Sequence, residues 1–229
     1  MLFLLPTIPY NSSMNCMIVD YGTGNIQSVH NALEHLGHSV TRTSNPADIQ
    51  QCDVLIFPGQ GAFGPAMQTL KNQHWVTPLQ DYIASKRPFI GICLGFQLCF
   101  NASQESQNTQ GLGVFPGTLQ HFSSTMPDPT NPKGHPLSVP HMGWNTLTCQ
   151  GQHPALQAVH NQHVYFVHSY YLPQTALTTF SNATSMCTTT YGAPFVSALA
   201  NDTQLITQFH PEKSGEVGLS LLKGFLDTL

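Results

Sequence analysis

Short apolar runs alternate with helically spaced apolar positions over the first two-thirds of the chain. The runs that indicate buried strands are residues 16–20, 54–57 and 89–92. After the first of them, apolar side chains recur at helical spacing from Ile26 to Leu36, and Gly37 is a suitable stop. A second helix is expected after the third run, through about Phe100. Strands that alternate with helices predict a mostly parallel sheet, with functional residues at the carboxyl ends of its strands.

From about residue 112 the pattern changes to short strands separated by turns. The strand-like segments lie near residues 113–121, 144–148, 163–168, 176–181, 186–190, 195–199 and 205–209. Residues 123–137 are rich in Pro, Ser, Thr and Asn, which indicates an exposed loop, and a last helix is expected over residues 215–226. We find no internal repeat. The length suits one large α/β domain over residues 16–229.

The composition limits the class of partner. Charged residues make up 8% of the 229 residues, against roughly a quarter in an average soluble protein, and the formal net charge is -4. Lys and Arg form no cluster along the sequence. This argues against a nucleic-acid partner, because phosphate binding needs a basic face.

The amino terminus is apolar without forming a targeting signal. Residues 1–6 have no basic region, and Pro6 and Pro9 interrupt an apolar run that is too short for a signal peptide. Nowhere does the chain approach the roughly 20 consecutive apolar residues of a membrane helix, so no membrane partner is expected. We expect residues 1–15 to be a disordered tail, or a start assigned too early.

The cysteines do not form a recognisable framework. The six of them stand at positions 16, 52, 93, 99, 149 and 187. They include no CxxC pair and no regular spacing, so neither a zinc site nor a disulfide scaffold is expected. Reduced thiols in a cytoplasmic protein are the simpler interpretation, and one thiol is then available as a nucleophile. No metal and no cofactor are predicted.

Cys93 has the local surroundings of such a nucleophile. A buried strand runs directly into a helix at this residue, and Gly91 and Gly95 lie two residues to either side. Small neighbours allow the tight, strained turn of a nucleophile elbow, which lifts the reactive atom above the sheet. The positive end of the following helix favours the thiolate. The alternative is a buried structural cysteine, and the glycine pattern argues for catalysis.

His210 is the best candidate base among twelve histidines. It follows the last predicted strand and precedes Pro211 and Glu212. At the carboxyl end of a strand it can share the rim of the sheet with Cys93, and Glu212 can turn back to orient the imidazole. The three residues together predict a Cys-His-carboxylate arrangement.

Acyl transfer also needs donors for a tetrahedral oxyanion. Residues 58–61 (Pro-Gly-Gln-Gly) follow a buried strand, and Gly59 and Gly61 permit backbone orientations that aim N–H groups at a substrate. The amide of Leu94, directly after the nucleophile, is the natural second donor. An ordinary turn is the alternative for residues 58–61. Residues 22–24 (Gly-Thr-Gly) do not make a dinucleotide site, because the third glycine and the later acidic residue are missing.

These residues together resemble the class I glutamine amidotransferase family. The general resemblance is carried by residues 91–97 and 209–212. Within the family, the chain resembles the glutaminase subunits of imidazole glycerol phosphate synthase, through residues 20–25, 58–63, 140–145, 165–170 and 210–215. These motifs extend over nearly the whole chain. The resemblance implies a three-layer, flavodoxin-like fold with a mostly parallel central sheet, helices on both faces and additional antiparallel strands.

The resemblance also implies roles. Cys93 attacks the side-chain amide of L-glutamine, His210 carries the proton to the departing ammonia, and Glu212 orients His210. Gln97 matches the side chain that holds the substrate, and His168, Ser169 and Tyr170 match its backbone clamp. The ammonia is passed to a (β/α)8 cyclase subunit, in a heterodimer that serves histidine biosynthesis. Positions that match the interface and ammonia gate are Asn25, Trp144, Tyr165 and Lys213.

Two alternatives remain open. Gln60 stands where the family usually has an apolar residue, beside the predicted oxyanion segment, so the coupling to a partner is in question. Related glutaminases feed barrel partners that build amino sugars, and Gln60 favours these slightly, whereas Trp144 and residues 213–215 favour histidine synthesis. A subunit that has kept the fold and lost the reaction is the other alternative, and the intact Cys93 argues against it.

Overall fold

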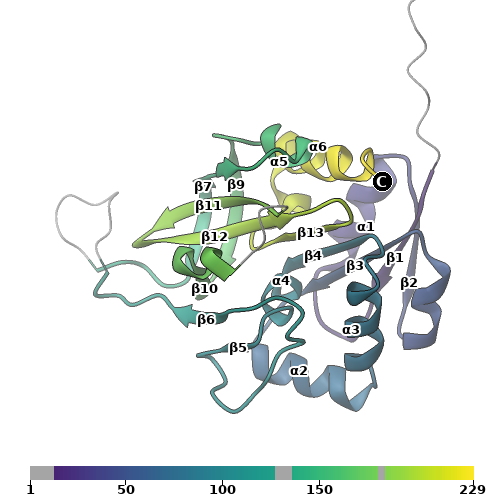
Figure 1. The fold of residues 1–229 in the computed structure, drawn as a ribbon, viewed down its shortest axis with the longest axis horizontal. Helices are drawn as coiled ribbons and strands as arrows, with labels where there is room; N and C mark the ends of the chain where they lie inside the picture. The colour runs from purple at the N-terminus through teal and green to yellow at the C-terminus, as the bar shows by residue number, and fades with distance from the viewer. Residues whose placement is uncertain (1–12, 127–135, 180–183) are drawn as a thin grey trace, which may run out of the picture.

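The computed structural model describes residues 13–126, 136–179 and 184–229 (Figure 1). Its strands are β1 (Asn15–Val19), β2 (Ser39–Thr43), β3 (Val54–Gly59), β4 (Phe89–Cys93), β5 (Ala102–Ser103), β6 (Thr118–His121), β7 (His141–Thr146), β8 (Thr148–Gln150), β9 (His163–His168), β10 (Tyr170–Pro173), β11 (Ser185–Tyr191), β12 (Ala193–Ala200) and β13 (Gln204–Thr207). Its helices are α1 (Ile26–His35), α2 (Phe63–Asn72), α3 (Val76–Ala84), α4 (Leu94–Leu98), α5 (Pro154–Gln157) and α6 (Gly215–Leu226), with short 3-10 helices η1 (Pro46–Gln51), η2 (Gln174–Thr179) and η3 (Pro211–Lys213).

The central sheet is parallel where the site is built. Its strand order is β2-β1-β3-β4-β13-β12-β10-β6-β5, and the first five strands pair in parallel. Strands β10, β11 and β12 extend it with antiparallel pairs, and β8 joins at β11. The predicted α/β class and mostly parallel sheet are confirmed. The carboxyl ends of β3, β4 and β13 lie next to one another, which brings three distant segments of the chain to one edge.

Side-chain alternation along the strands produces the three layers. Cys16 and Ile18 of β1 belong to an apolar cluster with α1 and α6, whereas Met17 and Val19 belong to a cluster with α2 and α3. Figure 1 shows these helix pairs on opposite sides of the sheet. Successive strand residues point to opposite faces, so a run that is buried throughout requires cover on both sides.

The predicted helices and strands agree best with the structure where apolar residues recur regularly along the sequence. The last helix has the predicted bounds, and α1 begins at Ile26 and ends just before Gly37, whose φ is 88°. Strand β2 was not predicted, because four of its five residues are only partly buried or exposed at the edge of the sheet. The strand predicted near 176–181 is wrong for residues 176–179, and residues 180–181 lie outside the described part of the chain. The preceding strand, β10, ends at Pro173, which has no N–H to donate to a neighbouring strand. Residues 174–179 then form a 3-10 helix.

Both predicted irregular segments fall partly outside the described residues. Residues 1–12 of the expected tail and 127–135 of the expected loop are not described. The remainder of the tail is tied to the domain. Asn15 begins β1, and the amide of Ser39 lies within hydrogen-bond distance of the Met14 carbonyl and the Ser13 hydroxyl. Ser13 and Met14 therefore contact the domain, and the domain start at residue 16 stays a prediction.

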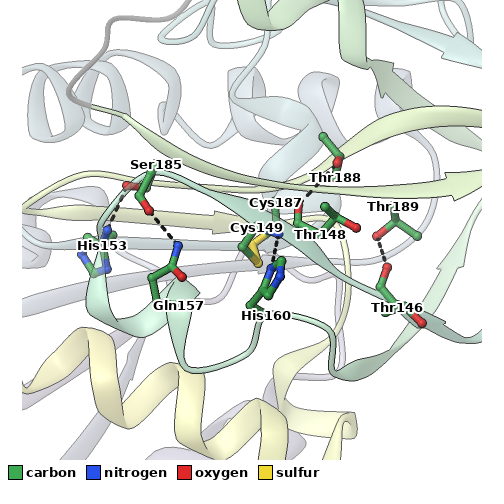
Figure 2. The surroundings of a disulfide bond; sticks show 11 residues. Thr146, Thr148, Cys149, His153, Gln157, His160, Ser185, Cys187, Thr188 and Thr189 are labelled. Atoms are coloured by element: carbon green, nitrogen blue, oxygen red, sulfur yellow. Dashed lines mark hydrogen bonds between the residues drawn. A yellow bond between two sulfur atoms is a disulfide. The ribbon is translucent and has the colours of Figure 1, made fainter.

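One cysteine prediction is corrected. Cys149 of β8 and Cys187 of β11 form a disulfide (Figure 2). Cys16, Cys52, Cys93 and Cys99 are free. The two strands are antiparallel neighbours, and their register places these two cysteines directly opposite each other. Spacing along the chain could not reveal this pairing, because 38 positions separate the two residues. The cytoplasmic location, which was inferred from reduced thiols, stays a prediction.

Strands β7 and β9 form a separate two-stranded sheet that borders the site. Its outward face carries two exposed apolar side chains, Met142 at 66% and Trp144 at 58%. Within the described part of the chain, no helix has both the length and the apolar character needed to cross a bilayer.

Candidate active site

Cys93 stands at a strained turn between β4 and α4. Its φ is 56° and its ψ -106°, a combination that a non-glycine residue adopts only when its surroundings enforce it. Close packing of α4 against β3 holds Cys93 in this conformation. It requires glycine at position 95, because a Cβ at Gly95 would lie 1.8 Å from the carbonyl oxygen of Phe57. Only glycine lets α4 approach β3 this closely. The predicted nucleophile elbow is therefore present in the backbone.

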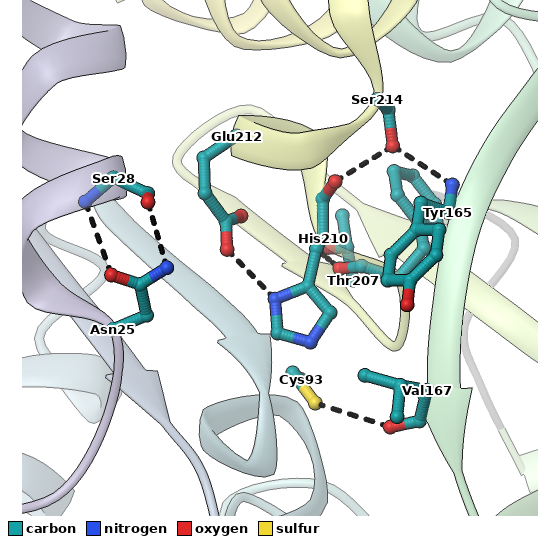
Figure 3. A network of polar contacts seen from close by, with 10 residues as sticks. Asn25, Ser28, Cys93, Tyr165, Val167, Thr207, His210, Glu212 and Ser214 are labelled. Carbon is teal, nitrogen blue, oxygen red and sulfur yellow. Dashed lines mark hydrogen bonds and ion pairs between the residues drawn. The ribbon is translucent and has the colours of Figure 1, made fainter. Parts of the chain in front are cut away.

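His210 and Glu212 form a buried pair beside this turn. Nδ1 of His210 donates to Oε1 of Glu212 at 2.7 Å, and the two side chains are only 3% and 1% exposed. In Figure 3 the opposite ring nitrogen, Nε2, points toward Cys93. This Nε2 is buried and has no hydrogen-bond partner among the described residues. The imidazole is thus fixed on one side and free to react on the other.

The charges around His210 favour its protonated form. Burial by itself lowers the pKa of His210, but the nearby Cys93, followed by the Glu212 carboxylate, outweighs burial and raises the pKa to about 10. The Cys93 thiol lies 4.0 Å from the carbonyl oxygen of Val167 in β9, a long and weak contact that leaves the sulfur available. The arrangement suits a thiolate–imidazolium pair.

Ser214 holds the backbone around His210, and the sequence did not single it out. Its hydroxyl donates to the His210 carbonyl at 2.7 Å and accepts from the Tyr165 amide at 3.0 Å. The His210 amide donates to the Tyr165 carbonyl, also at 3.0 Å. These bonds tie η3 to β9 (Figure 3), so the imidazole sits on a rigid frame rather than on a loose loop.

A cavity of about 480 Å³ opens over the sulfur. Its lining consists of Gln60, Gly61, Cys93, Leu94, Gln97, Glu105, Pro140, Tyr165, Val167, His168, Ser169, Tyr170, His210 and Lys213. Most residues predicted for the site are therefore gathered around one space. Glu212 lies behind His210, and Gly59 pairs with Cys93 across β3 and β4 without lining the cavity.

The predicted oxyanion segment borders this cavity from the end of β3. Gly61 has a φ of 96°, and a Cβ at Gly59 would meet the Tyr21 hydroxyl at 2.5 Å and Leu94 Cβ at 3.0 Å. Both positions therefore favour glycine, as an oxyanion segment and an ordinary turn would each require. The role of these amides and of the Leu94 amide as oxyanion donors stays a prediction.

Gln97 connects α4 to the predicted substrate clamp. Its Nε2 donates to the Tyr170 carbonyl and to Oε1 of Gln208, each at 3.0 Å. Ser169 is the single residue between β9 and β10, and its carbonyl accepts from the Phe122 amide at 3.0 Å. The clamp backbone is thus held by the side chain of Gln97 and by the backbone amide of Phe122.

The four predicted interface residues lie in different places. Tyr165 and Lys213 line the cavity, and Trp144 contacts Tyr165 edge-on at its outer rim, with ring centroids 6.1 Å apart. Asn25 lies outside the cavity and caps α1: its Oδ1 accepts from the Ser28 amide at 3.4 Å, and its Nδ2 donates to the Ser28 hydroxyl at 2.7 Å. An interface role for Asn25 stays a prediction, beside this structural one.

Glu105 was missed by the sequence analysis. It lines the cavity, and its Oε2 accepts from the amide of Phe63 at the start of α2, at 2.7 Å. No motif around it marks a carboxylate as functional, so only the fold reveals it. No group of three or more potential metal ligands occurs in the described ranges.

The fold and this site define a class of protein. The model of the glutamine amidotransferase class-I family matches residues 17–228. The chain therefore belongs to the class I glutamine amidotransferase family.

Particular relatives narrow the class. The chain is 42% identical, over 213 residues, to the imidazole glycerol phosphate synthase subunit HisH of Syntrophotalea carbinolica, covering 92% of this chain and 98% of that protein. It is 44% identical, over 210 residues, to the chloroplastic imidazole glycerol phosphate synthase hisHF of Arabidopsis thaliana, covering 91% of this chain. The chain spans only 33% of the length of the Arabidopsis protein.

Solved structures confirm the fold. The structure of PurLQS from Thermotoga maritima superposes with a TM-score of 0.68 at 15% identity, covering 94% of this chain and 98% of that one. A structure described as a crystal structure of glutamine amidotransferase gives a TM-score of 0.67 at 14% identity, covering 93% and 97%. At such identities the likeness concerns the fold alone.

Proposed function

We propose that this chain is the glutaminase subunit of imidazole glycerol phosphate synthase. It hydrolyses L-glutamine to glutamate and ammonia, and delivers the ammonia to a (β/α)8 cyclase subunit in a heterodimer that serves L-histidine biosynthesis. The observation that carries the proposal is Cys93 at a strained turn, faced by the buried pair of His210 and Glu212. The HisH and hisHF relatives named above support it.

The first half of the reaction forms a thioester. The Cys93 thiolate attacks the side-chain amide carbon of glutamine, and the carbonyl oxygen becomes an oxyanion that the amide of Leu94 and the segment Gly59–Gly61 stabilise. His210 Nε2–H then protonates the departing nitrogen. The C–N bond breaks, ammonia leaves, and the glutamyl group remains on sulfur while the imidazole is neutral.

The second half restores the enzyme. The neutral His210 takes a proton from water, and the resulting hydroxide attacks the thioester carbon. The C–S bond breaks and releases glutamate, which leaves the Cys93 thiolate beside an imidazolium. Glu212, whose Oε1 lies 2.7 Å from Nδ1 of His210, stabilises each imidazolium and fixes the ring.

The cavity lining suits an amino acid. Glutamine carries an ammonium and a carboxylate on its α-carbon, and the lining includes both a carboxylate, Glu105, and backbone groups of Ser169 and Tyr170. We assign Glu105 to the α-ammonium, since it is the acidic residue of the lining, and Gln97 with residues 168–170 to the remaining contacts. Specificity then comes from matching charges at the mouth, away from the sulfur.

The cyclase partner would cover the β7–β9 sheet. Met142 and Trp144 are exposed apolar side chains beside the cavity mouth, where Lys213 also lies. Such a patch fits a protein interface, because exposed aromatic side chains are enriched at binding hot spots. The relatives named above favour this partner over the amino-sugar alternative, and the intact pair of Cys93 and His210 opposes a non-catalytic subunit.

The test is glutamate release by the isolated subunit, then with the cyclase subunit from the same organism, then with cyclase and its nucleotide substrate. We expect activity to rise at each step. Cys93→Ala should abolish glutamine-dependent synthesis and leave ammonia-dependent synthesis by the partner intact. Cys99→Ala is the matched control, because Cys99 is a buried free thiol whose pKa is raised by burial. Full activity in Cys93→Ala, or none in the wild type with its partner, would refute the assignment.

A further inference from the structure

Two histidines outside the catalytic pair lie buried next to the substrate clamp. His141 of β7 and His168 of β9 face each other in register and are 3% and 5% exposed. Nδ1 of His141 lies 3.1 Å from Nε2 of His168. Buried imidazoles in contact need a defined pattern of donors and acceptors, since an unpaired polar atom in a core is costly.

The pattern is fixed at the clamp end. Nδ1 of His168 lies 2.8 Å from the Tyr170 carbonyl oxygen, which can only accept, so Nδ1 carries the hydrogen. A neutral imidazole has one N–H, and therefore Nε2 of His168 accepts. His141 must then donate to it from its own Nδ1, which leaves Nε2 of His141 as an acceptor.

Asn145 completes the chain at the other end. Its Oδ1 accepts from the Thr146 amide at 2.8 Å, which fixes the orientation of the side-chain amide. Its Nδ2 therefore donates, to Nε2 of His141 at 3.3 Å and to the Thr190 carbonyl at 3.1 Å. The hydrogen bonds run in one direction, from Asn145 through His141 and His168 to Tyr170.

The surroundings keep both rings neutral. His141 stacks on Tyr191 and Phe166, at 4.0 and 4.8 Å between centroids, and His168 contacts Phe195 at 5.1 Å. Burial lowers the pKa of His141 to about 4, and burial together with the neighbouring His141 lowers the pKa of His168 to about 3. A second proton on either ring would break the donor order.

The hydrogen-bond series ends at the backbone carbonyl of Tyr170, a residue of the substrate clamp. The Tyr170 carbonyl accepts from His168 on one side and from Gln97 on the other. It belongs to the segment that lines the cavity with Ser169, which the proposed function assigns to the α-carbon end of glutamine. Two donors from separate elements hold this carbonyl, so the peptide between Tyr170 and Tyr171 has little freedom to rotate.

We infer that His141 and His168 are positioning residues for substrate binding, forming a tautomer-fixed series of hydrogen bonds that holds the Tyr170–Tyr171 peptide, and with it the Tyr170 backbone of the clamp, in its binding orientation. The inference rests on the proposed function for the identity of the substrate, but not for the hydrogen-bond order. Neither imidazole touches the reacting atoms. Their loss should therefore raise KM for glutamine more than it lowers kcat.

The kinetic test uses the full chain assayed with its cyclase subunit. His168→Phe keeps a ring of similar shape and removes the donor to Tyr170, so we expect KM to rise about tenfold, with kcat within about threefold of wild type. His168→Asn places a donor near the position of Nδ1 and should recover part of the loss. Tyr191→Phe is the matched control. Tyr191→Phe keeps the stack on His141 and removes a hydroxyl that bonds to the Ser138 carbonyl. That hydroxyl is not part of the hydrogen-bond series from Asn145 to Tyr170.

A second measurement does not depend on activity. Long-range 15N–1H NMR spectra distinguish the tautomers of a neutral imidazole, and the phenylalanine variants at positions 141 and 168 identify the two signals. We expect both rings to be neutral at pH 6 with the hydrogen on Nδ1, the form that free histidine disfavours. A hydrogen on Nε2 of either ring, a charged ring at pH 6, or an unchanged KM in His168→Phe would overturn the inference. A wild type without glutaminase activity but with both expected tautomers would refute the proposed function alone.

Discussion

Replacing Glu212 by Gln tests how the catalytic imidazole is held. The change keeps the side-chain shape and one hydrogen-bond acceptor but removes the charge. Little water screens the pair, because the His210 and Glu212 side chains are 3% and 1% exposed and their atoms lie 2.7 Å apart. A hydrogen bond to a charged group contributes about 1.5–3 kcal/mol, roughly twice a neutral one. We therefore expect a loss of about 1–2 kcal/mol, which lowers kcat about 5–30-fold.

The assay is steady-state glutamate release in the presence of the cyclase subunit. His210→Ala removes the proton carrier itself and should lower kcat about 10²–10⁴-fold. Glu216→Gln is the matched control, an exposed carboxylate in the first turn of α6, and should change kcat less than about twofold. If Glu212→Gln and His210→Ala were equally and completely inactive while folded, the division of roles between carboxylate and imidazole would be wrong.

The pH dependence has a definite sign. Cys93 and Glu212 raise the pKa of His210 to about 10, against the effect of burial, so the imidazolium persists well above neutral pH. Glu212→Gln removes one cause of the raised pKa, and the alkaline limb of kcat/KM should move to lower pH. Stability follows the same sign. The contribution of the pair is full below the unfolded value of about 6.5 and is lost as pH rises through about 10. An alkaline limb that does not move would contradict this reasoning.

Three further predictions concern the surface, the cysteines and the start of the domain. Trp144→Ala should weaken binding to the cyclase at least tenfold by calorimetry, with an unchanged Tm because the side chain is 58% exposed. Thiol titration of the unfolded, unreduced chain should give four free cysteines, and Cys187→Ser should lower Tm, since a disulfide typically contributes about 2–4 kcal/mol; six free thiols would refute the pairing. A chain starting at Ser13 should keep the full Tm, whereas one starting at Met17 should lose stability because it lacks two residues of β1; equal Tm values would show that these residues add nothing.

The parts of the site that depend on short segments could be predicted from the sequence. The elbow at Cys93 requires only a buried strand, small neighbours and a following helix, all within ten residues of the chain, 89–98. His210 and Glu212 are two residues apart, so their contact is also local. The parallel order of the strands then brings these segments together, because β3, β4 and β13 are neighbours and their carboxyl ends lie at the same edge of the sheet. Function at a strand end is predictable when the neighbours in the sheet are predictable.

Features that depend on register between distant segments were missed. The disulfide needs Cys149 and Cys187 directly opposite each other, and Glu105 reaches the cavity only because its loop folds against the start of α2. The polar edge strand β2 has too little apolar alternation to be recognised alone. In each case the local sequence carries no signal, because the residue contacts a partner that is distant in the sequence.

Strand β7 shows how register can reverse the usual pattern. His141 and Asn145 point inward, whereas Met142 and Trp144 point outward and are exposed. A shift of one residue would bury the apolar pair and expose the polar one, which is what the hydrophobic effect alone favours. The observed register is stable because the inward polar atoms are all hydrogen-bonded, through the chain that ends at Tyr170. Exposure of the outward apolar pair, Met142 and Trp144, is favourable only if another surface buries these side chains. One strand thus carries both the support that we infer for the substrate clamp and the face that we propose for the partner, so a substitution that breaks the inward hydrogen bonds should also disturb the outward face.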